Sequence, residues 1–417
     1  MTKRPMTKRL MTRISRLGLA LMALILIACS QSEPPSNTPA VKPNEPQATL
    51  AKAASPSLVD PNATPETRAL YRNLFALQGK QVLFGHQDSL AYGFHWTAEP
   101  DRSDVKDVTG SFPAVYGWDL GHLEKVDAQN LDGVSFELMR ESIKKSFARG
   151  GVITISWHLI NPVTGGGYND TSAPAVAEIL PGGSKHEVFK TFLDALVEFN
   201  QSLVVDGVQV PIIFRPWHEH NGEWFWWGKG HVTEDDYIQL WRFTVEYIRD
   251  EKQQHNLIYA FSPDRSRMNL DSLEADYLYA YPGDDYVDVI GFDNYWDLGH
   301  PANTASLEEQ REHFVRSLTA VSRIAQEKGK LAALSEGGAE AIPDPEFWTG
   351  HLLKGLEANE DTRRISWVLV WRNATNGGYN SKHHYVPYPG HASADDFVRF
   401  KQRERVLFED ELPPLYR

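Results

Sequence analysis

The sequence predicts an α/β fold, a single (β/α)8 TIM barrel whose functional site lies at the C-terminal ends of its strands. From residue 81 onwards, short and nearly continuous apolar runs alternate with longer amphipathic segments, which is typical of a parallel sheet covered by helices. Eight such units over about 300 residues fit a closed barrel better than an open doubly wound sheet. No G-x-G-x-x-G motif follows the first run, and this counts against a nucleotide-binding sheet.

Each unit of the predicted barrel contributes one strand, and several contribute a clear amphipathic helix. The predicted strands are residues 82–84, 114–116, 152–155, 212–214, 257–260, 287–290, 331–334 and 367–370. The clearest helices are expected at residues 134–149, 186–200, 234–250, 306–328 and 393–408. Neither an internal repeat nor a linker to a second domain is visible, so residues 63–417 are expected to form one domain.

The first 28 residues are predicted to be an export signal and not part of the fold. Residues 1–16 carry basic groups, and residues 17–28 form an apolar run of twelve. A membrane-spanning helix needs about 20 apolar residues, whereas a run of this length is typical of a signal peptide.

The cysteine that follows the apolar run predicts a lipid anchor. Residues 26–29 (LIAC) resemble a bacterial lipobox, and Cys29 is the only cysteine in the chain. The resemblance implies cleavage before Cys29 and acylation of its thiol. A plain secretory signal with an incidental cysteine is the alternative. The proline-rich residues 29–62 are expected to be a semi-rigid tether. Ser30 stands where an Asp would indicate retention in the inner membrane, which favours the outer membrane.

The composition describes an acidic globular protein that is rich in aromatic residues. Hydrophobic residues make up 41% and aromatic residues 11% of the 417 residues, enough to bury a sizeable core. Without the six basic groups of residues 1–28, the net charge would fall from −13 to about −19, which disfavours nucleic acid as a partner. Twelve Trp residues favour neutral ligands with flat apolar faces. A single cysteine excludes a disulfide framework and a multi-cysteine metal site. The protein is expected to be a monomer.

Most of the predicted strands end in histidine, aromatic or acidic residues. Barrel enzymes place their chemistry at this end of the strands, so we interpret the pattern as a substrate-binding mouth. The candidate residues at the strand ends are His86, Trp118, His122, His158, His218, Glu219, Asp293, Tyr295, Glu336, Trp371 and Arg372.

Two carboxyl groups of this set indicate a specific chemistry. Glu219 closes the fourth strand and Glu336 the seventh, and these ends face each other across the mouth of an eight-stranded barrel. Glycoside hydrolysis needs such a pair, with the carboxyls about 5–5.5 Å apart in a retaining enzyme. The proton donor needs apolar neighbours and the nucleophile needs hydrogen-bond donors. The expected apolar neighbours of Glu219 are Trp217, Trp224, Trp226 and Trp227, and the expected donors to Glu336 are Arg372 and Tyr295.

One fifteen-residue block makes the sequence recognisable. Residues 214–228 (FRPWHEHNGEWFWWG) closely resemble the acid/base signature of glycoside hydrolase family 26, whose members are mostly β-mannanases. Residues 335–337 (SEG) are similar to the nucleophile segment of that family, and residues 291–295 (GFDNY) to its segment on the sixth strand. In the larger clan of barrel glycosidases an Asn usually precedes the acid/base, and His218 takes that place here. The likeness covers roughly residues 65–410.

The resemblance implies a role for most of the candidate residues. It makes Glu219 the acid/base and Glu336 the nucleophile. It places His218 and Tyr295 beside the nucleophile and the 2-hydroxyl of the sugar, and gives Asp293 an orienting role. The resemblance also implies that Trp224 stacks on the leaving-group side, and that the glycone side is lined by His158, Trp371 and Arg372. The roles of His86, Trp118 and His122 rest on their position at strand ends alone.

The activity implied is retaining cleavage of β-1,4-mannosidic linkages, with no metal or organic cofactor, since two carboxyls suffice. Three other functions stay open. A family 26 enzyme acting on xylan or mixed-linkage glucan would share the site, and a carbohydrate-binding lipoprotein without activity would keep the Trp residues. A metallohydrolase would use the strand-end histidines, although the H-E-x-x-H pattern of a zinc helix is absent after Glu219.

Three loops bear on where the polymer is cut. Residues 88–112, 123–127 and 165–167 are long or glycine-rich enough to wall off one end of a groove. A groove closed two sugars beyond Glu336 would release mannobiose from a chain end, whereas an open groove would release mixed oligosaccharides. The loops favour chain-end release slightly, with ordinary surface insertions as the alternative.

Overall fold

The computed structural model describes residues 56–375 and 381–417, so the predicted signal peptide, Cys29 and most of the predicted tether lie outside the described residues. Eight parallel strands close into a barrel, because the last of them pairs with the first through Leu83 and Trp367. The eight strands are β1 (Val82–Gln87), β4 (Val115–Asp119), β5 (Val152–Ser156), β8 (Ile212–Arg215), β9 (Leu257–Phe261), β10 (Val289–Asn294), β11 (Leu331–Gly337) and β12 (Ile365–Val370). The predicted (β/α)8 barrel is confirmed, and each of the eight predicted strands overlaps an observed one.

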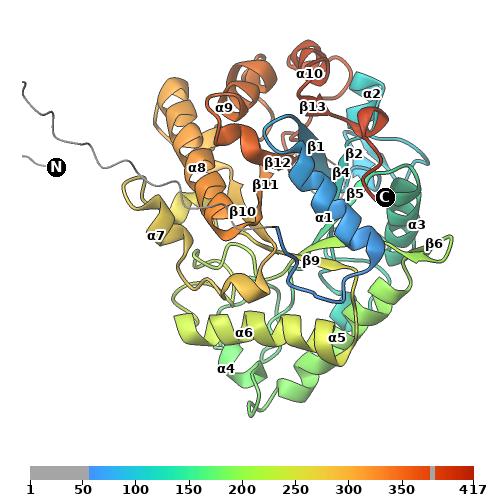
Figure 1. The fold of residues 1–417 in the computed structure, drawn as a ribbon, viewed down its shortest axis with the longest axis vertical. Coiled ribbons are helices and arrows are strands. Elements are labelled where there is room, and N and C mark those ends of the chain that lie inside the picture. Colours follow the sequence, from blue (N-terminus) through green and yellow to red (C-terminus); the bar gives the residue numbers. More distant parts are fainter. Residues whose placement is uncertain (1–55, 376–380) are drawn as a thin grey trace, which may run out of the picture. The chain divides into compact units, whose positions relative to one another are not determined.

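Helices surround this barrel (Figure 1). The longer helices are α1 (Pro65–Leu77), α3 (Phe136–Ala148), α5 (His186–Gln201), α6 (Glu234–Glu246), α8 (Leu307–Lys328) and α10 (Ala394–Lys401), and the shorter ones are α2 (Asp104–Thr109), α4 (Val176–Ile179), α7 (Leu273–Tyr277) and α9 (Lys354–Leu356). Tyr247–Glu251 extends α6 as a π-helix, and a second π-helix, Phe347–Leu353, precedes α9. The remaining strands are β13 (Val406–Leu407) and two small hairpins, β2 (Tyr92–Gly93) with β3 (Trp96–Thr97) and β6 (Val204–Val205) with β7 (Val208–Gln209). Short 3-10 helices lie in several of the loops. Among the described residues, none of the helices has both the length and the hydrophobicity needed to cross a lipid bilayer.

Local sequence signals explain where the longest helix begins and ends. The Ser306 hydroxyl accepts a hydrogen bond from the backbone N–H of Glu309, and the Glu309 side chain accepts one from the backbone of Ser306, which forms a capping box before α8. The helix stops at Gly329, which has a left-handed backbone with φ of 66°. The predicted helix at residues 306–328 is therefore confirmed almost to the residue.

The predicted helix at residues 393–408 is wrong in its second half. α10 ends at Lys401, and β13 follows, where Val406 and Leu407 pair with Val82 and Leu83 of β1. Phe408 then stacks on Phe84 with the ring centroids 4.9 Å apart. The apolar residues that suggested one continuous amphipathic helix serve a strand pairing and an aromatic cluster instead, and tertiary contacts override the helical pattern.

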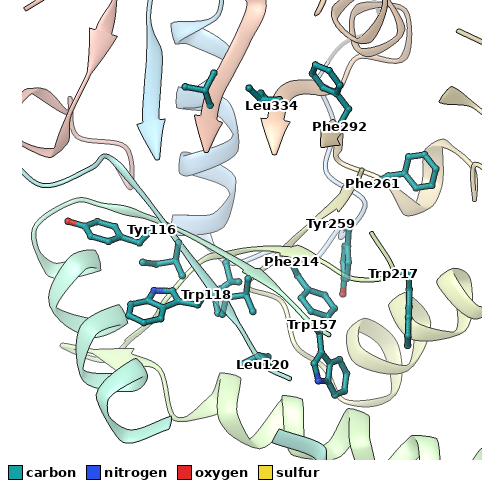
Figure 2. Packing of buried hydrophobic residues seen from close by; sticks show 14 of the residues in the cluster. Tyr116, Trp118, Leu120, Trp157, Phe214, Trp217, Tyr259, Phe261, Phe292 and Leu334 are labelled. Atoms are coloured by element: carbon teal, nitrogen blue, oxygen red, sulfur yellow. The ribbon is translucent and has the colours of Figure 1, made fainter. Parts of the chain in front are cut away.

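Alternation along the strands separates two faces of the barrel wall. One buried set, including Leu83, Val115, Ile213 and Val289, fills the barrel interior together with residues of α1. The other set packs under the surrounding helices, and Figure 2 shows several of its members on these strands, among them Tyr116, Trp118, Phe214 and Phe292. Successive side chains of a strand point to opposite faces. At the C-terminal ends of the strands, the positions that face the barrel interior are therefore occupied by the polar residues Asp119, Ser156, Arg215 and Asp293.

A bulge in β11 breaks this alternation at one decisive place. The register between β10 and β11 shifts so that Phe292 pairs with Leu334 but Asp293 pairs with Glu336. Without the shift, Glu336 would point to the helix-facing side. Bulges re-aim side chains in this way beside active sites.

The folded domain begins slightly before residue 63, the expected boundary. Val59 and Asp60 are buried, and the backbone N–H of Val59 donates a 2.6 Å hydrogen bond to Asp288 at the start of the β10 segment. The last residues of the predicted tether are thus part of the packed domain.

Candidate active site

Glu219 lies on the turn that follows β8 and has an unusual backbone. Its φ of 53° is in the left-handed region, and its backbone N–H donates a 2.8 Å hydrogen bond to the carbonyl of Ser262. The side chain is 9% exposed, and its Oε2 accepts a 2.7 Å hydrogen bond from the indole N–H of Trp224. Burial raises the pKa of Glu219 well above its ordinary value. The negative charges of Asp264, Asp293 and Glu336, in decreasing order of effect, raise this pKa further. These surroundings therefore favour the protonated form of Glu219.

Glu336 has the opposite surroundings. The guanidinium of Arg215 donates to its Oε2, and the Tyr295 hydroxyl donates a 2.7 Å hydrogen bond to its Oε1. The side chain is nearly buried, so these donors stabilise the ionised carboxylate in the absence of bulk water. The two glutamates lie close enough for the charge of Glu336 to act on Glu219. A carboxyl whose protonated form is favoured and a carboxylate held by a cation thus lie near each other at the C-terminal end of the barrel.

Arg215 joins Glu336 to a second carboxylate. Its other terminal nitrogen donates a 2.6 Å hydrogen bond to Asp293, which also accepts a 2.8 Å bond from the Ser335 hydroxyl. Burial opposes the charge of Arg215, but Asp293 and Glu336 raise its pKa, so it stays a cation. This arrangement agrees with the orienting role expected for Asp293. Arg215 itself was not among the candidates, although its alternation with Ile213 places it in the barrel interior.

His158 and His218 meet at the ends of β5 and β8. Their Nε2 atoms lie 3.2 Å apart, and Nδ1 of His158 lies 2.7 Å from Oδ2 of Asp119. Phe225 packs edge-on against both imidazole rings. Two of the expected substrate-binding histidines are therefore brought together beside the carboxyl pair.

Arg372 is not the hydrogen-bond donor to Glu336 that was expected. It pairs with Asp132 of the loop after β4, and its guanidinium lies 5.2 Å from the centroid of the Trp371 ring. Arg215, rather than Arg372, is the cation bound to Glu336. Asp88 is buried close enough to feel the charges of Asp132 and Arg372, and burial, followed by the charge of Asp132, raises its pKa to about 8.

His86 and Trp118 lie on the wrong face of their strands for direct contact with a substrate in the barrel mouth. Trp118 is fully buried in the cluster under the helices, and His86 occupies the equivalent helix-facing position on β1. Burial lowers the pKa of His86 to about 3, so its ring is neutral. Their neighbours Gln87 and Asp119 are the residues that face inwards. His122 remains partly exposed on the loop after β4, with Nδ1 3.8 Å from Asp127.

Of the four expected apolar neighbours, Trp224 is the one with a hydrogen bond to Glu219. The bond comes from its indole N–H, as described above, and the guanidinium of Arg267 lies 5.1 Å from the centroid of the Trp224 ring. The other three indoles are core residues whose N–H groups are used internally. Trp217 donates to Thr244, Trp226 to the carbonyl of Leu159, and Trp227 to the carbonyl of His218. They support the turn that carries Glu219 from beneath.

Within residues 56–375 and 381–417, no group of three or more His, Cys, Asp or Glu side chains has the geometry to hold a metal ion. The strand-end histidines instead contact other protein groups. His158 contacts Asp119 and His218, and His220 lies 2.9 Å from the carbonyl of Tyr279 through its Nε2.

Comparisons with known proteins agree with this geometry. The family model described as glycosyl hydrolase family 26 matches residues 59–351. A mannan endo-1,4-beta-mannosidase of Bifidobacterium adolescentis is 35% identical over 368 residues, which cover 85% of this chain and 35% of that protein. A mannan endo-1,4-beta-mannosidase of Bacillus subtilis is 31% identical over 61% of this chain and 72% of its own length. The chain thus spans about a third of the first relative and nearly three quarters of the second.

Solved structures share the fold over nearly the whole described chain. A GH26 beta-mannanase from Bacteroides ovatus superposes with a TM-score of 0.78 at 42% identity, covering 85% of this chain and 98% of that one. GH26C from Muricauda sp. MAR_2010_75 superposes with a TM-score of 0.77 at 34% identity, covering 86% and 96% of the two chains.

Proposed function

This chain belongs to glycosyl hydrolase family 26, and from that membership we propose that it cleaves β-1,4-mannosidic linkages in mannan and mannooligosaccharides with retention of configuration. The observation that carries the proposal is the contrast between two carboxyls at one end of the barrel. Burial and neighbouring carboxyls favour the protonated form of Glu219, whereas Arg215 and Tyr295 donate hydrogen bonds to the carboxylate of Glu336. Double displacement needs one group of each kind.

The geometry supports two half-reactions. In the first, a carboxylate oxygen of Glu336 bonds to the anomeric carbon while the glycosidic oxygen departs and takes the proton of Glu219. In the second, the ionised Glu219 removes a proton from water, whose oxygen displaces Glu336 and returns the sugar as a hemiacetal. Each proton leaves and returns through Glu219, so no other acid or base is required.

The choice of mannan rests on the relatives and on one residue. The two curated relatives above are both named mannan endo-1,4-beta-mannosidases. His218 precedes Glu219 where other barrel glycosidases usually carry Asn, and the axial 2-hydroxyl of mannose calls for a different contact from that of glucose or xylose. Product analysis on mannan, xylan, mixed-linkage glucan and defined mannooligosaccharides tests this choice. Faster hydrolysis of xylan or glucan than of mannan would contradict it.

A carbohydrate-binding protein without activity is the candidate from another class. Replacing Glu219 or Glu336 by Ala separates the two functions, because a hydrolase loses several orders of magnitude in rate while binding persists. If a wild-type preparation binds mannan but releases no reducing ends, the hydrolase proposal fails.

Within the general activity of a family 26 mannanase, we propose a preference for releasing mannobiose from a chain end. β4 and β12 flank β1 in the barrel, and the Asp132–Arg372 bridge joins the loop after β4 to the end of β12. This bridge therefore spans the end of β1 on the side that the family resemblance assigns to the glycone. The 88–112 loop is tied to the same end, since Asn373 donates a 2.7 Å hydrogen bond to Asp104.

A time course on mannohexaose tests the position of cleavage. Mannobiose as the dominant early product, with a slow fall in mannan viscosity, supports a groove closed on the glycone side. Early mannotriose and mannotetraose in comparable amounts, with a rapid fall in viscosity, would show an open groove.

We also propose that Cys29 carries the lipid that holds the enzyme at the outer membrane. The support is the apolar run of residues 17–28 and the single cysteine directly after it. Two or more acyl chains would anchor the protein stably. Replacing Cys29 by Ser should move the enzyme from the membrane fraction to the soluble fraction. An unchanged distribution would remove the proposal.

A further inference from the structure

Asp119, at the end of β4, is surrounded by hydrogen-bond donors. Its Oδ1 accepts bonds from the backbone N–H groups of Gly121 at 2.8 Å and His158 at 3.3 Å. Its Oδ2 accepts from the Ser156 hydroxyl at 2.8 Å and lies 2.7 Å from Nδ1 of His158. Burial opposes ionisation, but His158 and these donors lower the pKa of Asp119 to about 2. Asp119 is therefore a carboxylate, and Nδ1 of His158 must carry a proton.

The contact between His158 and His218 then allows two arrangements of protons. Two nitrogen atoms 3.2 Å apart share one hydrogen, which belongs to one ring or the other. In the first arrangement His158 is an imidazolium that donates from Nε2, and a neutral His218 holds its proton on Nδ1. In the second, His158 is neutral and accepts from Nε2 of His218, which leaves Nδ1 of His218 without a proton. The free nitrogen of His218 is a donor in the first arrangement and an acceptor in the second.

The surroundings select the first arrangement. Burial opposes charge on His158, but Asp119, then Glu336 and Asp132, raise its pKa above the ordinary value. Burial, Arg215 and His158 together lower the pKa of His218 well below it. The cation of the pair is therefore His158, and His218 is the neutral acceptor. Within the described part of the chain, no group bonds to the buried Nδ1 of His218.

We propose that Asp119 is a positioning residue that acts through His158 to make Nδ1–H of His218 a hydrogen-bond donor to a hydroxyl of the sugar bound at Glu336. A buried donor without a partner is unfavourable, and a substrate hydroxyl would satisfy it. The inference rests on the proposed function, because it takes the nucleophile and the sugar position from that account. It adds a residue, Asp119, and a proton position that the carboxyl pair alone does not specify.

The proton positions can be measured directly in the wild-type enzyme. Histidine labelled with ¹⁵N reports which ring nitrogens are protonated, and the spectra of His158→Gln and His218→Gln assign the two rings. At pH 6 we expect both nitrogens of His158 to carry protons and His218 to carry its proton on Nδ1. A proton on Nε2 of His218 at this pH would overturn the inference.

Two substitutions at Asp119 separate the direction of the bond from the charge. In Asp119→Asn, the two backbone donors keep the amide oxygen in the Oδ1 position, so the amide N–H faces Nδ1 of His158. A neutral His158 then carries its proton on Nε2 and still donates to His218. In Asp119→Ala, nothing holds the direction. We expect kcat on mannohexaose to stay within about tenfold of wild type in Asp119→Asn and to fall about 100-fold in Asp119→Ala.

A buried carboxylate at the opposite end of the barrel provides the matched control. Asp288 accepts bonds from the backbone N–H groups of Val59 at 2.6 Å and Tyr259 at 2.8 Å, and both contacts are structural. Asp288→Asn should lower Tm and leave kcat unchanged. Equal kcat in Asp119→Ala and wild type would overturn the inference. If wild type does not hydrolyse mannan, the proposed function fails, whereas the ¹⁵N spectrum still decides the proton positions.

Discussion

The guanidinium of Arg215 at the end of β8 donates to the carboxylate of Glu336 at the end of β11. This contact crosses the barrel interior, because both side chains belong to the inward row, Arg215 by strand alternation and Glu336 through the bulge in β11. It provides Glu336, the proposed nucleophile, with a permanent cation in a nearly buried space, where such an interaction is stronger than in solvent.

Removing this cation should reduce the rate more than the affinity. Arg215→Met leaves Asp293 and Glu336 buried without a shared counter-charge, so the pair favours binding a proton and the attacking carboxylate is lost. We expect kcat to fall by about 100-fold or more, with a smaller change in KM. Steady-state kinetics on mannohexaose measure both parameters.

Arg265 is the matched control for this substitution. It is also buried, and it pairs with Asp297 at 2.9 Å away from the carboxyl pair. Arg265→Met should lower the thermal midpoint while kcat of the folded enzyme stays near wild type. Equal losses of kcat in the two variants would show that Arg215 acts only through folding.

The Tyr295 hydroxyl should matter for rate through its 2.7 Å bond to Glu336. Tyr295→Phe removes one donor to the nucleophile, and we expect kcat to fall by about 10- to 100-fold. Tyr277→Phe is the control, since its hydroxyl bonds to the carbonyl of Gly291 at 2.8 Å and the residue is buried. That variant should lose about 1 kcal/mol of stability and no activity. An unchanged kcat in Tyr295→Phe would contradict the donor role.

The raised pKa of Glu219 predicts the alkaline side of the pH profile. The protonated form is the active one, so kcat/KM is full below the pKa of Glu219 and falls as the pH rises through it. The decline should lie well above the ordinary glutamic acid value. Glu219→Ala should abolish this limb and slow mannan hydrolysis by about 1000-fold, yet spare the first step with a 2,4-dinitrophenyl leaving group, which needs no acid. Comparable losses on both substrates would argue against Glu219 as the acid.

If the Asp132–Arg372 bridge closes the groove on the glycone side, Asp132 determines which products are released. Asp132→Ala removes the partner of Arg372 and opens the bridge over β1, so the share of mannotriose among early products from mannohexaose should rise several-fold. Glu137→Ala, on the exposed face of α3 and 3.8 Å from Arg140, should leave the pattern unchanged. Chromatography of the early products is the measurement, and identical patterns in the two variants would contradict the bridge as a wall.

The barrel and the carboxyl pair could be predicted from the sequence, because both depend on patterns that are local in the chain. Apolar runs gave the strands, and Glu219 and Glu336 follow two of them directly. His86 and Trp118 were predicted to face the mouth because strand ends alone were considered, without the alternation of side chains along each strand. Counting by two from Ile213 to Arg215, or from Val115 to Asp119, would have found the inward residues.

Other features depend on contacts between segments that are distant in the chain, and they could not be predicted from the sequence. Arg372 follows β12 as expected, but its partner Asp132 is about 240 residues away in sequence, and no local pattern links them. The bulge that turns Glu336 inwards is a property of the β10–β11 register and not of either strand alone. In the same way, Val406 and Leu407 read as part of a helix until β1 offers them a strand partner.

The stereochemistry of the first product tests the central claim most directly. Proton NMR during the first minutes of hydrolysis, before mutarotation, distinguishes the two anomers of the new reducing end. Retaining cleavage by Glu219 and Glu336 predicts that the β-anomer of the mannooligosaccharide appears first and that the α-anomer grows in slowly. Initial appearance of the α-anomer would contradict a glycosyl-enzyme intermediate on Glu336.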